Sequence, residues 1–265
     1  MGVGAERAKQ LFVPEISHIF RPEVIILPTP AEVDQFAANT FIEQVQLNPN
    51  SVLTLPTGST PVRMYEIIRQ TYKEQGLDLS GLTVNNLDEY WPLPATSPSS
   101  YASFMAENLF NHVNVPPNQH HIPNSDASDP HEEAARYESV LAQQPTDLAI
   151  VGIGPGTTCH IGFNGPSSAH DSRTRYVQLD DQTLNANAQY CDGNSPPPGA
   201  ITQGIGNILE AERILLIAKG AGKAWGIQRT LEGPVNSDSP ASFLRLHPRV
   251  TFILDNAAAQ MLSTH

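Results

Sequence analysis

The sequence predicts an α/β fold of the Rossmann-like type, in which a mainly parallel sheet carries helices on both faces. Short apolar runs alternate along the chain with longer segments of helical spacing. Polar or glycine-rich stretches follow four of the runs, and open α/β sheets bind ligands at the carboxyl edge of their strands. No linker divides the alternation, so we expect a single domain over residues 23–265, preceded by a short N-terminal extension, residues 1–22.

The first half of the chain is expected to form three strands and four helices. Val, Ile and Leu dominate the three expected strands, which are too short to be helices. These strands cover residues 24–27, 51–55 and 82–87. In the expected helices, apolar residues recur at every third or fourth position. These helices cover residues 31–45, 61–74, 101–113 and 130–143.

The second half continues the alternation, and helical connections of this kind imply parallel strands. Its most apolar run, residues 148–153, is typical of a buried strand and leads into a glycine-rich loop, residues 154–166. Further strands are expected at residues 175–179, 214–218 and 250–254, and residues 200–202 lead into Gly204 and Gly206. Further helices are expected at residues 208–212, 223–231 and 256–262.

Composition limits the classes of function. The 265 residues carry a formal net charge of −12, which disfavours nucleic acid and anionic membranes as partners. The sequence has no apolar core of signal-peptide type and no run long enough to span a bilayer. The two cysteines, Cys159 and Cys191, make neither a disulfide framework nor a metal-ligand spacing. We therefore expect a cytoplasmic protein.

The second expected strand runs into Thr57, Gly58, Ser59 and Thr60, and a helix pattern opens at Pro61. Small residues let backbone N–H groups approach a ligand closely, and a helix N-terminus carries a partial positive charge. This combination favours a phosphate. The alternative is an ordinary strand–turn–helix junction with Thr60 as the N-cap. The segment is not a Walker loop, because no Gly-Lys-Ser/Thr follows.

Asp88 directly follows the third expected strand. Partial desolvation of a carboxylate raises its pKa and makes it a better base. The alternatives are a helix cap or a surface acid. Because the phosphate-type loop is expected at the same edge of the sheet, we favour a functional Asp88 with Glu89 as a supporting or structural acid.

Four other side chains are candidates for a functional or a structural role. His160 lies in the glycine-rich loop, where a histidine can transfer protons near neutral pH; alternatively, loop carbonyls satisfy it. Lys223, one of four lysines, opens a helix, where an ammonium is poorly placed unless an anion intervenes. Lys219 is expected to be a solvated charge at a strand end. Cys159 precedes His160, but neighbours on an extended chain point in opposite directions, so we expect no catalytic Cys–His pair.

Several collinear segments, from about residue 23 to the C-terminus, together carry a resemblance to a known family. They are Leu-Pro-Thr-Gly-Ser-Thr-Pro at 55–61, Asn-Leu-Asp-Glu-Tyr at 86–90, Ser-Tyr at 100–101 with Phe-Met at 104–105, Gly-Ile-Gly-Pro at 152–155, His-Ile-Gly-Phe-Asn at 160–164, Ser-Arg-Thr-Arg at 172–175, Gly-Ile-Gly at 204–206, Gly-Lys-Ala at 222–224 and Leu-His-Pro at 246–248. The chain resembles the glucosamine-6-phosphate deaminase (isomerase) family, which is related to 6-phosphogluconolactonases. The block at 86–90, with Tyr101, favours the deaminase branch.

The resemblance implies a phosphorylated amino sugar as substrate and an aldose–ketose isomerisation with loss of ammonia. It implies that Asp88 moves a proton between C2 and C1 and that His160 assists ring opening. No metal and no organic cofactor is implied. The expected substrate- and phosphate-binding residues are Thr57, Gly58, Ser59, Thr60, Lys223 and Gly154.

Three positions depart from the family's usual pattern. Members read Gly-Pro-Asp-Gly-His-Ile, whereas here two extra residues intervene and Thr158 takes the place of the aspartate. Gly165 replaces a glutamate, and Gln189 stands where an arginine helps to hold the phosphate. Losing one charge-assisted partner of the histidine costs about 1.5–3 kcal/mol of transition-state stabilisation. Arg173 and Arg175 are candidates to replace the missing arginine.

Two alternatives therefore stay open beside the deaminase. The first is a hydrolase of the 6-phosphogluconolactonase type, which has less need of a glutamate at position 165. The second is a sugar-phosphate-binding protein that has lost catalysis. The sequence leaves the oligomeric state open, with a homo-oligomer among the alternatives.

Overall fold

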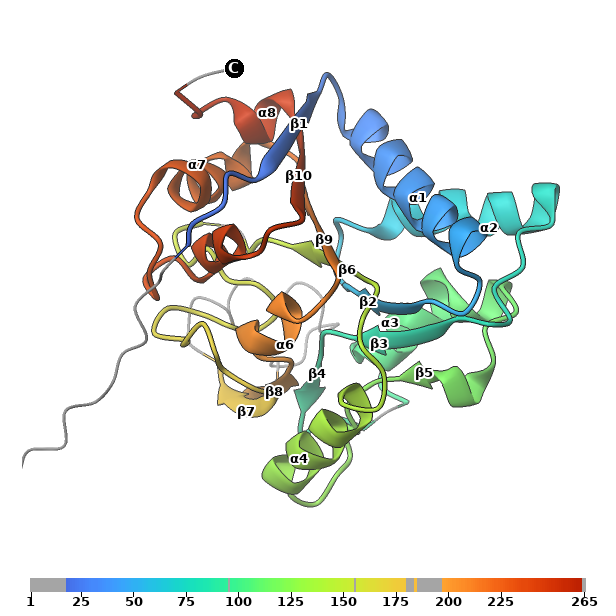
Figure 1. The fold of residues 1–265 in the computed structure, drawn as a ribbon. Coiled ribbons are helices and arrows are strands. Elements are labelled where there is room, and N and C mark those ends of the chain that lie inside the picture. The colour runs from blue at the N-terminus through green and yellow to red at the C-terminus, as the bar shows by residue number, and fades with distance from the viewer. Residues whose placement is uncertain (1–17, 95, 155, 180–183, 185–196, 264–265) are drawn as a thin grey trace, which may run out of the picture.

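The computed structural model describes residues 18–94, 96–154, 156–179, 184 and 197–263. Within them, a parallel seven-stranded sheet forms the centre of the molecule (Figure 1). Its strands follow the order β1 (Glu23–Leu27), β10 (Val250–Asp255), β9 (Arg213–Ala218), β6 (Leu148–Gly152), β2 (Val52–Leu55), β3 (Thr83–Asn86) and β5 (His120–His121). The register is continuous between β6 and β9, where Ala149 lies opposite Ile214 and Val151 opposite Leu216.

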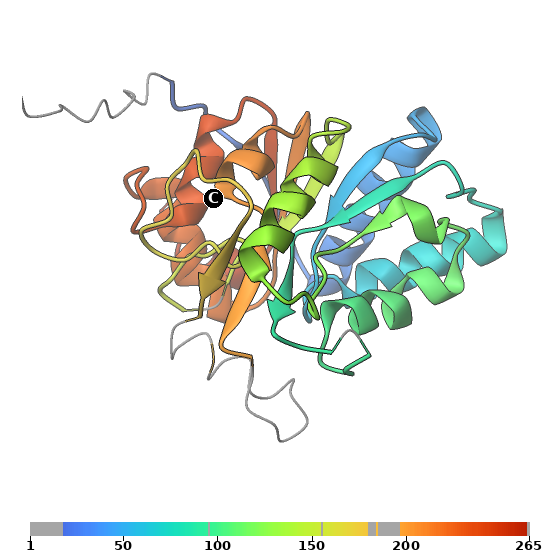
Figure 2. The same ribbon diagram turned by 90° about the horizontal axis from the view of Figure 1, so that it is seen from below.

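Helices cover both faces of this sheet, as predicted (Figure 2). One layer consists of α1 (Pro30–Leu47), α2 (Val62–Gln75) and α3 (Tyr101–Asn108). The opposite layer consists of α6 (Ile205–Leu209), α7 (Ala224–Glu232) and α8 (Asn256–Ala259). Alternate residues of β9 serve the two layers: Leu215 packs in the α1 layer and Leu216 in the α7 layer. Period-two alternation of a strand buried on both faces produces this division.

A second, antiparallel sheet was not predicted. It contains β4 (Asp88–Trp91), β8 (Gly199–Thr202) and β7 (Arg175–Gln178), in that order, and α4 (Pro130–Leu141) packs against β7 and β8. Asp88 follows the third strand as expected, but it pairs with Thr202 and therefore begins a strand of its own, β4, which was not predicted. The chain passes from β3 to β4 through Leu87, whose N–H donates to the carbonyl of Leu55 at 3.3 Å. No glycine or proline marks this change of sheet.

Several element ends differ from the expected ones. The helix α3 ends at Asn108, and the 3₁₀ turn Phe110–His112 follows. The helix α6 begins three residues earlier than expected, because Asn207 accepts the N–H of Gly204 at its start. The short strand β5 was not expected. Within the described residues, the other 3₁₀ turns are Pro117–Gln119, Ala221–Lys223 and Pro240–Leu246.

The described part of the extension, residues 18–22, has no regular structure. The N–H of Phe20 donates to the carbonyl of Arg245 at 2.7 Å, which ties this segment to the Pro240–Leu246 turn. The limits of the expected single domain stay a prediction. None of the helices in the described ranges is both long and apolar enough to cross a membrane.

Candidate active site

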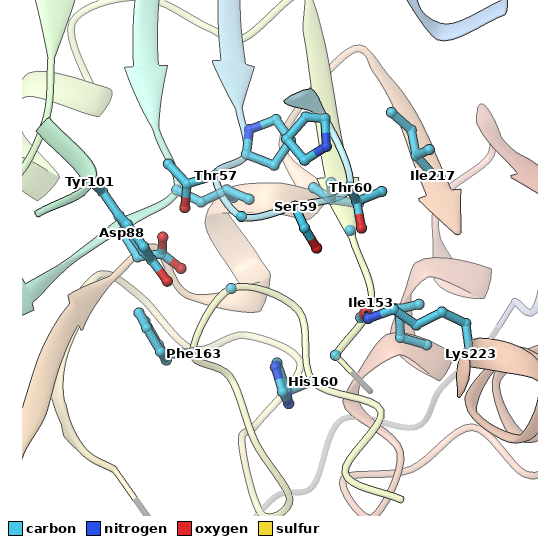
Figure 3. A pocket seen from close by; sticks show the side chains of 18 residues that line it. Thr57, Ser59, Thr60, Asp88, Tyr101, Ile153, His160, Phe163, Ile217 and Lys223 are labelled. Carbon is cyan, nitrogen blue, oxygen red and sulfur yellow. Dashed lines mark hydrogen bonds between the residues drawn. The ribbon is translucent and has the colours of Figure 1, made fainter. Parts of the chain in front are cut away.

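A cavity of about 370 Å3 opens at the carboxyl edge of the large sheet (Figure 3). The ends of β2, β6 and β9 and the start of β4 surround it. It brings together every residue expected at the site and present in the described ranges. These are Thr57, Gly58, Ser59, Thr60, Asp88, Gly154, His160 and Lys223. Ser59, Thr60 and Lys223 occupy one side of the cavity in Figure 3, and Asp88 occupies the other.

The turn after β2, residues 57–60, lines the cavity. Gly58 has a φ of 91°, a conformation that favours glycine. The helix α2 has Pro61 as its N-cap, with no side-chain hydrogen bond to its first turn in the described structure. The alternative in which Thr60 caps the helix is therefore wrong. The 14-residue helix α2 begins directly after Pro61 at the end of this turn, and a helix N-terminus favours an anion.

Lys223 supplies a cation on the same side of the cavity. It ends the 3₁₀ turn before α7, and its Nζ donates to the carbonyl of Ile153 at 2.5 Å. Burial lowers the pKa of Lys223 to about 8. Lys219, in contrast, forms a 2.5 Å ion pair with Asp34 and its side chain is 16% exposed. The expectation that Lys219 is a solvated charge is therefore wrong.

Asp88 is buried, and the loop after β6 crowds it. A Cβ added to Gly162 would lie 3.1 Å from Asp88 Oδ2, and Gly162 has a φ of 55°. Burial, reinforced by the adjacent charge of Glu89, raises the pKa of Asp88 to about 8. A carboxyl with this pKa is matched to proton transfer near neutral pH.

Glu89 has a structural position instead. Its carboxylate accepts N–H bonds from Tyr90 at 2.8 Å, Tyr101 at 2.9 Å and Ala102 at 2.8 Å. The last two N–H groups belong to the first turn of α3, where a negative charge is favoured. Burial raises the pKa of Glu89, while these three bonds oppose the shift.

His160 is fixed by close contact with its own loop. A Cβ on Gly154 would lie 2.0 Å from His160 Cε1, so only glycine allows the imidazole to pack there. The Gly154 N–H donates to the His160 carbonyl at 2.9 Å. Thr158 Oγ1 lies 2.6 Å from His160 Nδ1. Cys159 is buried in the apolar core, and the expectation that it forms no catalytic pair with His160 stays a prediction.

The departures from the family pattern have distinct surroundings. Thr158 and Gly165 line a second cavity, of about 300 Å3, that borders His160. A Cβ on Gly165 would meet nothing within 4 Å, so this position has room for a side chain. Gln189 lies outside the described residues. Arg173 pairs with Glu138 at 2.6 Å and Glu210 at 2.5 Å.

Neither arginine that was considered as a substitute lines the main cavity. Arg175 donates instead to Asn164 Oδ1 at 2.8 Å and to Ser168 Oγ at 3.0 Å. In the described structure, Lys223 is therefore the cationic side chain at the cavity.

Sequence reasoning did not assign a role to Tyr101 or Phe163, which also line the cavity. Their rings are nearly parallel, with centroids 6.1 Å apart, and both contact Tyr90. Tyr101 belonged to a segment that carries the family resemblance, but its contact with the cavity depends on long-range packing. In the described ranges, no three His, Cys, Asp or Glu residues gather as a metal-binding group.

Comparisons with known proteins agree with this fold. The model of the family described as glucosamine-6-phosphate isomerases/6-phosphogluconolactonase matches residues 29–252. A glucosamine-6-phosphate deaminase of Halothermothrix orenii is 43% identical over 241 residues, which cover 90% of this chain and 99% of the relative. The deaminase of Cellvibrio japonicus is 42% identical over 243 residues, 91% of this chain and 92% of the relative.

Solved structures place the chain in the same group. A monomeric glucosamine-6-phosphate deaminase superimposes with a TM-score of 0.86 at 38% identity, covering 90% of this chain and 99% of that one. The 6-phosphogluconolactonase from Trypanosoma cruzi has a TM-score of 0.75 at 20% identity, covering 93% and 99%, and shares the fold. The chain therefore belongs to the glucosamine-6-phosphate isomerase/6-phosphogluconolactonase family.

Proposed function

We propose that this protein is a glucosamine-6-phosphate deaminase, which converts glucosamine 6-phosphate and water into fructose 6-phosphate and ammonia. One observation carries the proposal: a single cavity combines an anion-binding turn and Lys223 with the carboxyl of Asp88 and the imidazole of His160. The relationship to deaminases over most of the chain supports the choice of an amino-sugar phosphate.

The phosphate binds at the side of the cavity formed by residues 57–60 and Lys223. The open N–H groups at the start of α2 donate to phosphate oxygens, and the Lys223 ammonium adds a charge. A bound phosphate dianion stabilises the charged form of Lys223 and thus opposes the effect of burial on its pKa.

Asp88 and His160 then act on the other end of the sugar. His160 takes the proton of the C1 hydroxyl and returns a proton to the ring oxygen, which opens the ring to an aldehyde. Asp88 removes the proton from C2 and delivers it to C1, which leaves an iminium at C2. Water adds to the iminium and ammonia leaves, so that the ketose is formed. Thr158 supports His160 with a hydrogen bond, without the charge of a carboxylate.

The test is a coupled assay of purified protein that measures ammonia and fructose 6-phosphate independently. We expect both products in equal amounts, and a fall in rate of about 10²–10⁴-fold on Asp88→Asn, since the amide cannot act as a base. Equal and undiminished rates in the wild type and Asp88→Asn would contradict the assigned role of Asp88. The absence of both products would contradict the deaminase.

The same preparation distinguishes the two alternatives. Hydrolysis of 6-phosphogluconolactone above the spontaneous rate, without ammonia from the amino sugar, would favour the lactonase. The unfilled space at Gly165 is the observation that keeps this alternative relevant. Calorimetric binding of glucosamine 6-phosphate without turnover would favour a binding protein that has lost catalysis. A cytoplasmic location is part of the proposal, because the substrate is a phosphorylated metabolite.

A further inference from the structure

Tyr101 lines the cavity beside Asp88, yet the roles assigned so far do not use it. Its backbone is fixed at the start of α3, where its N–H donates to Glu89 Oε1 at 2.9 Å. Its ring lies at 8° to that of Phe163 and packs against Tyr90, with centroids 4.9 Å apart. The side chain is therefore held from two sides, and Figure 3 shows it next to Asp88.

The Tyr101 hydroxyl has two hydroxyl neighbours. It lies 3.5 Å from the hydroxyl of Tyr90 and hydrogen-bonds with the side chain of Thr57. Burial and the nearby charge of Asp88 hold the pKa of Tyr101 well above its ordinary value. The hydroxyl thus keeps its proton over the working pH range and remains a hydrogen-bond donor.

The proposed proton transfer requires a donor of this kind. When Asp88 takes the proton from C2 of the open-chain aldehyde, the electron pair of the C2–H bond forms a C1–C2 double bond. The π electrons of the carbonyl then move to O1, where negative charge develops. This developing charge needs a preorganised donor. The substrate's ammonium then gives O1 a proton, and an enolamine results.

We propose that the hydroxyl of Tyr101 donates a hydrogen bond to O1 of the substrate while Asp88 removes the C2 proton, so that Tyr101 is a further catalytic residue. This inference rests on the proposed deaminase function. Base and donor lie beside each other on the same wall of the cavity, and C2 and O1 are separated by a single atom. Lys223 lies on the phosphate side, where its Nζ contacts the carbonyl of Ile153.

The test compares Tyr101→Phe with Tyr90→Phe in the full chain. Both variants keep an aromatic ring and remove one hydroxyl from the same cluster. Ammonia release is measured with glucosamine 6-phosphate and with the same sugar carrying deuterium at C2. We expect Tyr101→Phe to lower kcat about a hundredfold, the effect of losing an oxyanion donor. We expect its KM to stay within about threefold, as for an interaction made in the transition state.

The isotope effect distinguishes a catalytic role from a structural one. In Tyr101→Phe we expect a larger primary isotope effect on kcat than in the wild type, because cleavage of the C2–H bond becomes slower than ring opening and product release. Tyr90→Phe is expected to keep kcat within about threefold and to leave the isotope effect unchanged. Thermal unfolding of both variants shows whether the cluster is intact.

Two results would overturn the inference while the proposed function stands. One is an active Tyr101→Phe whose kcat remains within about threefold of the wild type. The other is an equal loss in both variants without a change in the isotope effect, which would make the cluster structural. If the wild type itself releases no ammonia, the proposed function fails and the role of Tyr101 fails with it.

Discussion

Burial moves the pKa values of Asp88 and Lys223 in opposite directions, to about 8 in both cases. In the empty cavity the carboxyl is protonated below this pH, and the amine is neutral above it. Each group is therefore balanced between its two forms near neutral pH. A substrate with a phosphate at one end and an ammonium at the other favours the charged form of both.

These shifts predict the pH dependence of kcat/KM. The rate should rise as the pH approaches about 8, because Asp88 loses its proton, and fall above about 8, because Lys223 loses its charge. Lys223→Arg keeps a positive charge at high pH and should move the falling limb upward while leaving the rising limb in place. Initial rates from pH 6 to pH 10 at constant ionic strength measure both limbs. A falling limb that is identical in both proteins would show that another group causes it.

The partner of His160 gives a second prediction. Thr158→Val keeps the shape of the side chain but removes the oxygen that lies 2.6 Å from Nδ1. Loss of one hydrogen bond of about 1–1.5 kcal/mol should lower kcat/KM about tenfold. Thr158→Ser retains the hydroxyl and is expected to recover most of the rate. If the valine variant equals the wild type, the contact does not support catalysis.

At the scale of elements, the loop between β6 and β7 determines the position of His160. Gly154→Ala should be severe, because the added Cβ would lie 2.0 Å from the imidazole. We expect a loss of about a hundredfold in kcat, as for a misplaced catalytic group. Gly165→Ala is the matched control in the same loop, since its Cβ would meet nothing within 4 Å. Steady-state kinetics of both variants test this. Similar kcat values would mean that the loop adapts.

The elements differ in how far the sequence predicted them. Apart from β5, the strands of the large sheet lie in the short runs from which they were expected, and their identity follows from composition and length alone. The small sheet was missed because β4 begins one residue after β3, with Leu87 between them and no turn residue to mark the change. The strand β5 has only two residues, too few to show a period.

The residues of the candidate site also divide into those that the sequence predicted and those that it did not. The turn at residues 57–60, Asp88, His160 and Lys223 were identified because each follows or precedes a recognisable element, and they share one cavity. The roles of Tyr101 and Gly162 were missed, because both depend on packing between segments far apart in sequence. The Lys219–Asp34 pair was missed for the same reason, since its partners are 185 positions apart.

At the scale of the whole molecule, a formal net charge of −12 opposes the approach of a phosphorylated sugar. Binding then depends on the local donors at α2 and Lys223. We expect fructose 6-phosphate at about 100 times its Kd to add about 2.7 kcal/mol of stability, because it binds the folded state. This corresponds to an increase in Tm of about 5–10 °C for a chain of this size.

A thermal unfolding series with increasing fructose 6-phosphate measures the shift. Fructose without phosphate is the matched ligand control and should leave Tm unchanged. Lys223→Met should reduce the shift at the same ligand concentration, because one charge-assisted bond is lost. An equal shift in Tm with both sugars would show that the phosphate group does not contribute to binding. Light scattering of the same samples determines whether the protein forms a homo-oligomer, an alternative that the sequence leaves open.

The backbone of Asp88 belongs to the small sheet, whereas the turn at residues 57–60 extends from the large one. The proposed general base and the proposed phosphate site thus belong to two different sheets, which are joined at Leu87 by hydrogen bonds to Leu55 and Gln203. The distance between the carboxyl of Asp88 and the turn therefore depends on the angle between the two sheets. Substitutions in β7, which lies on the other side of β8 from β4, can therefore slow proton transfer while binding of the sugar phosphate is preserved.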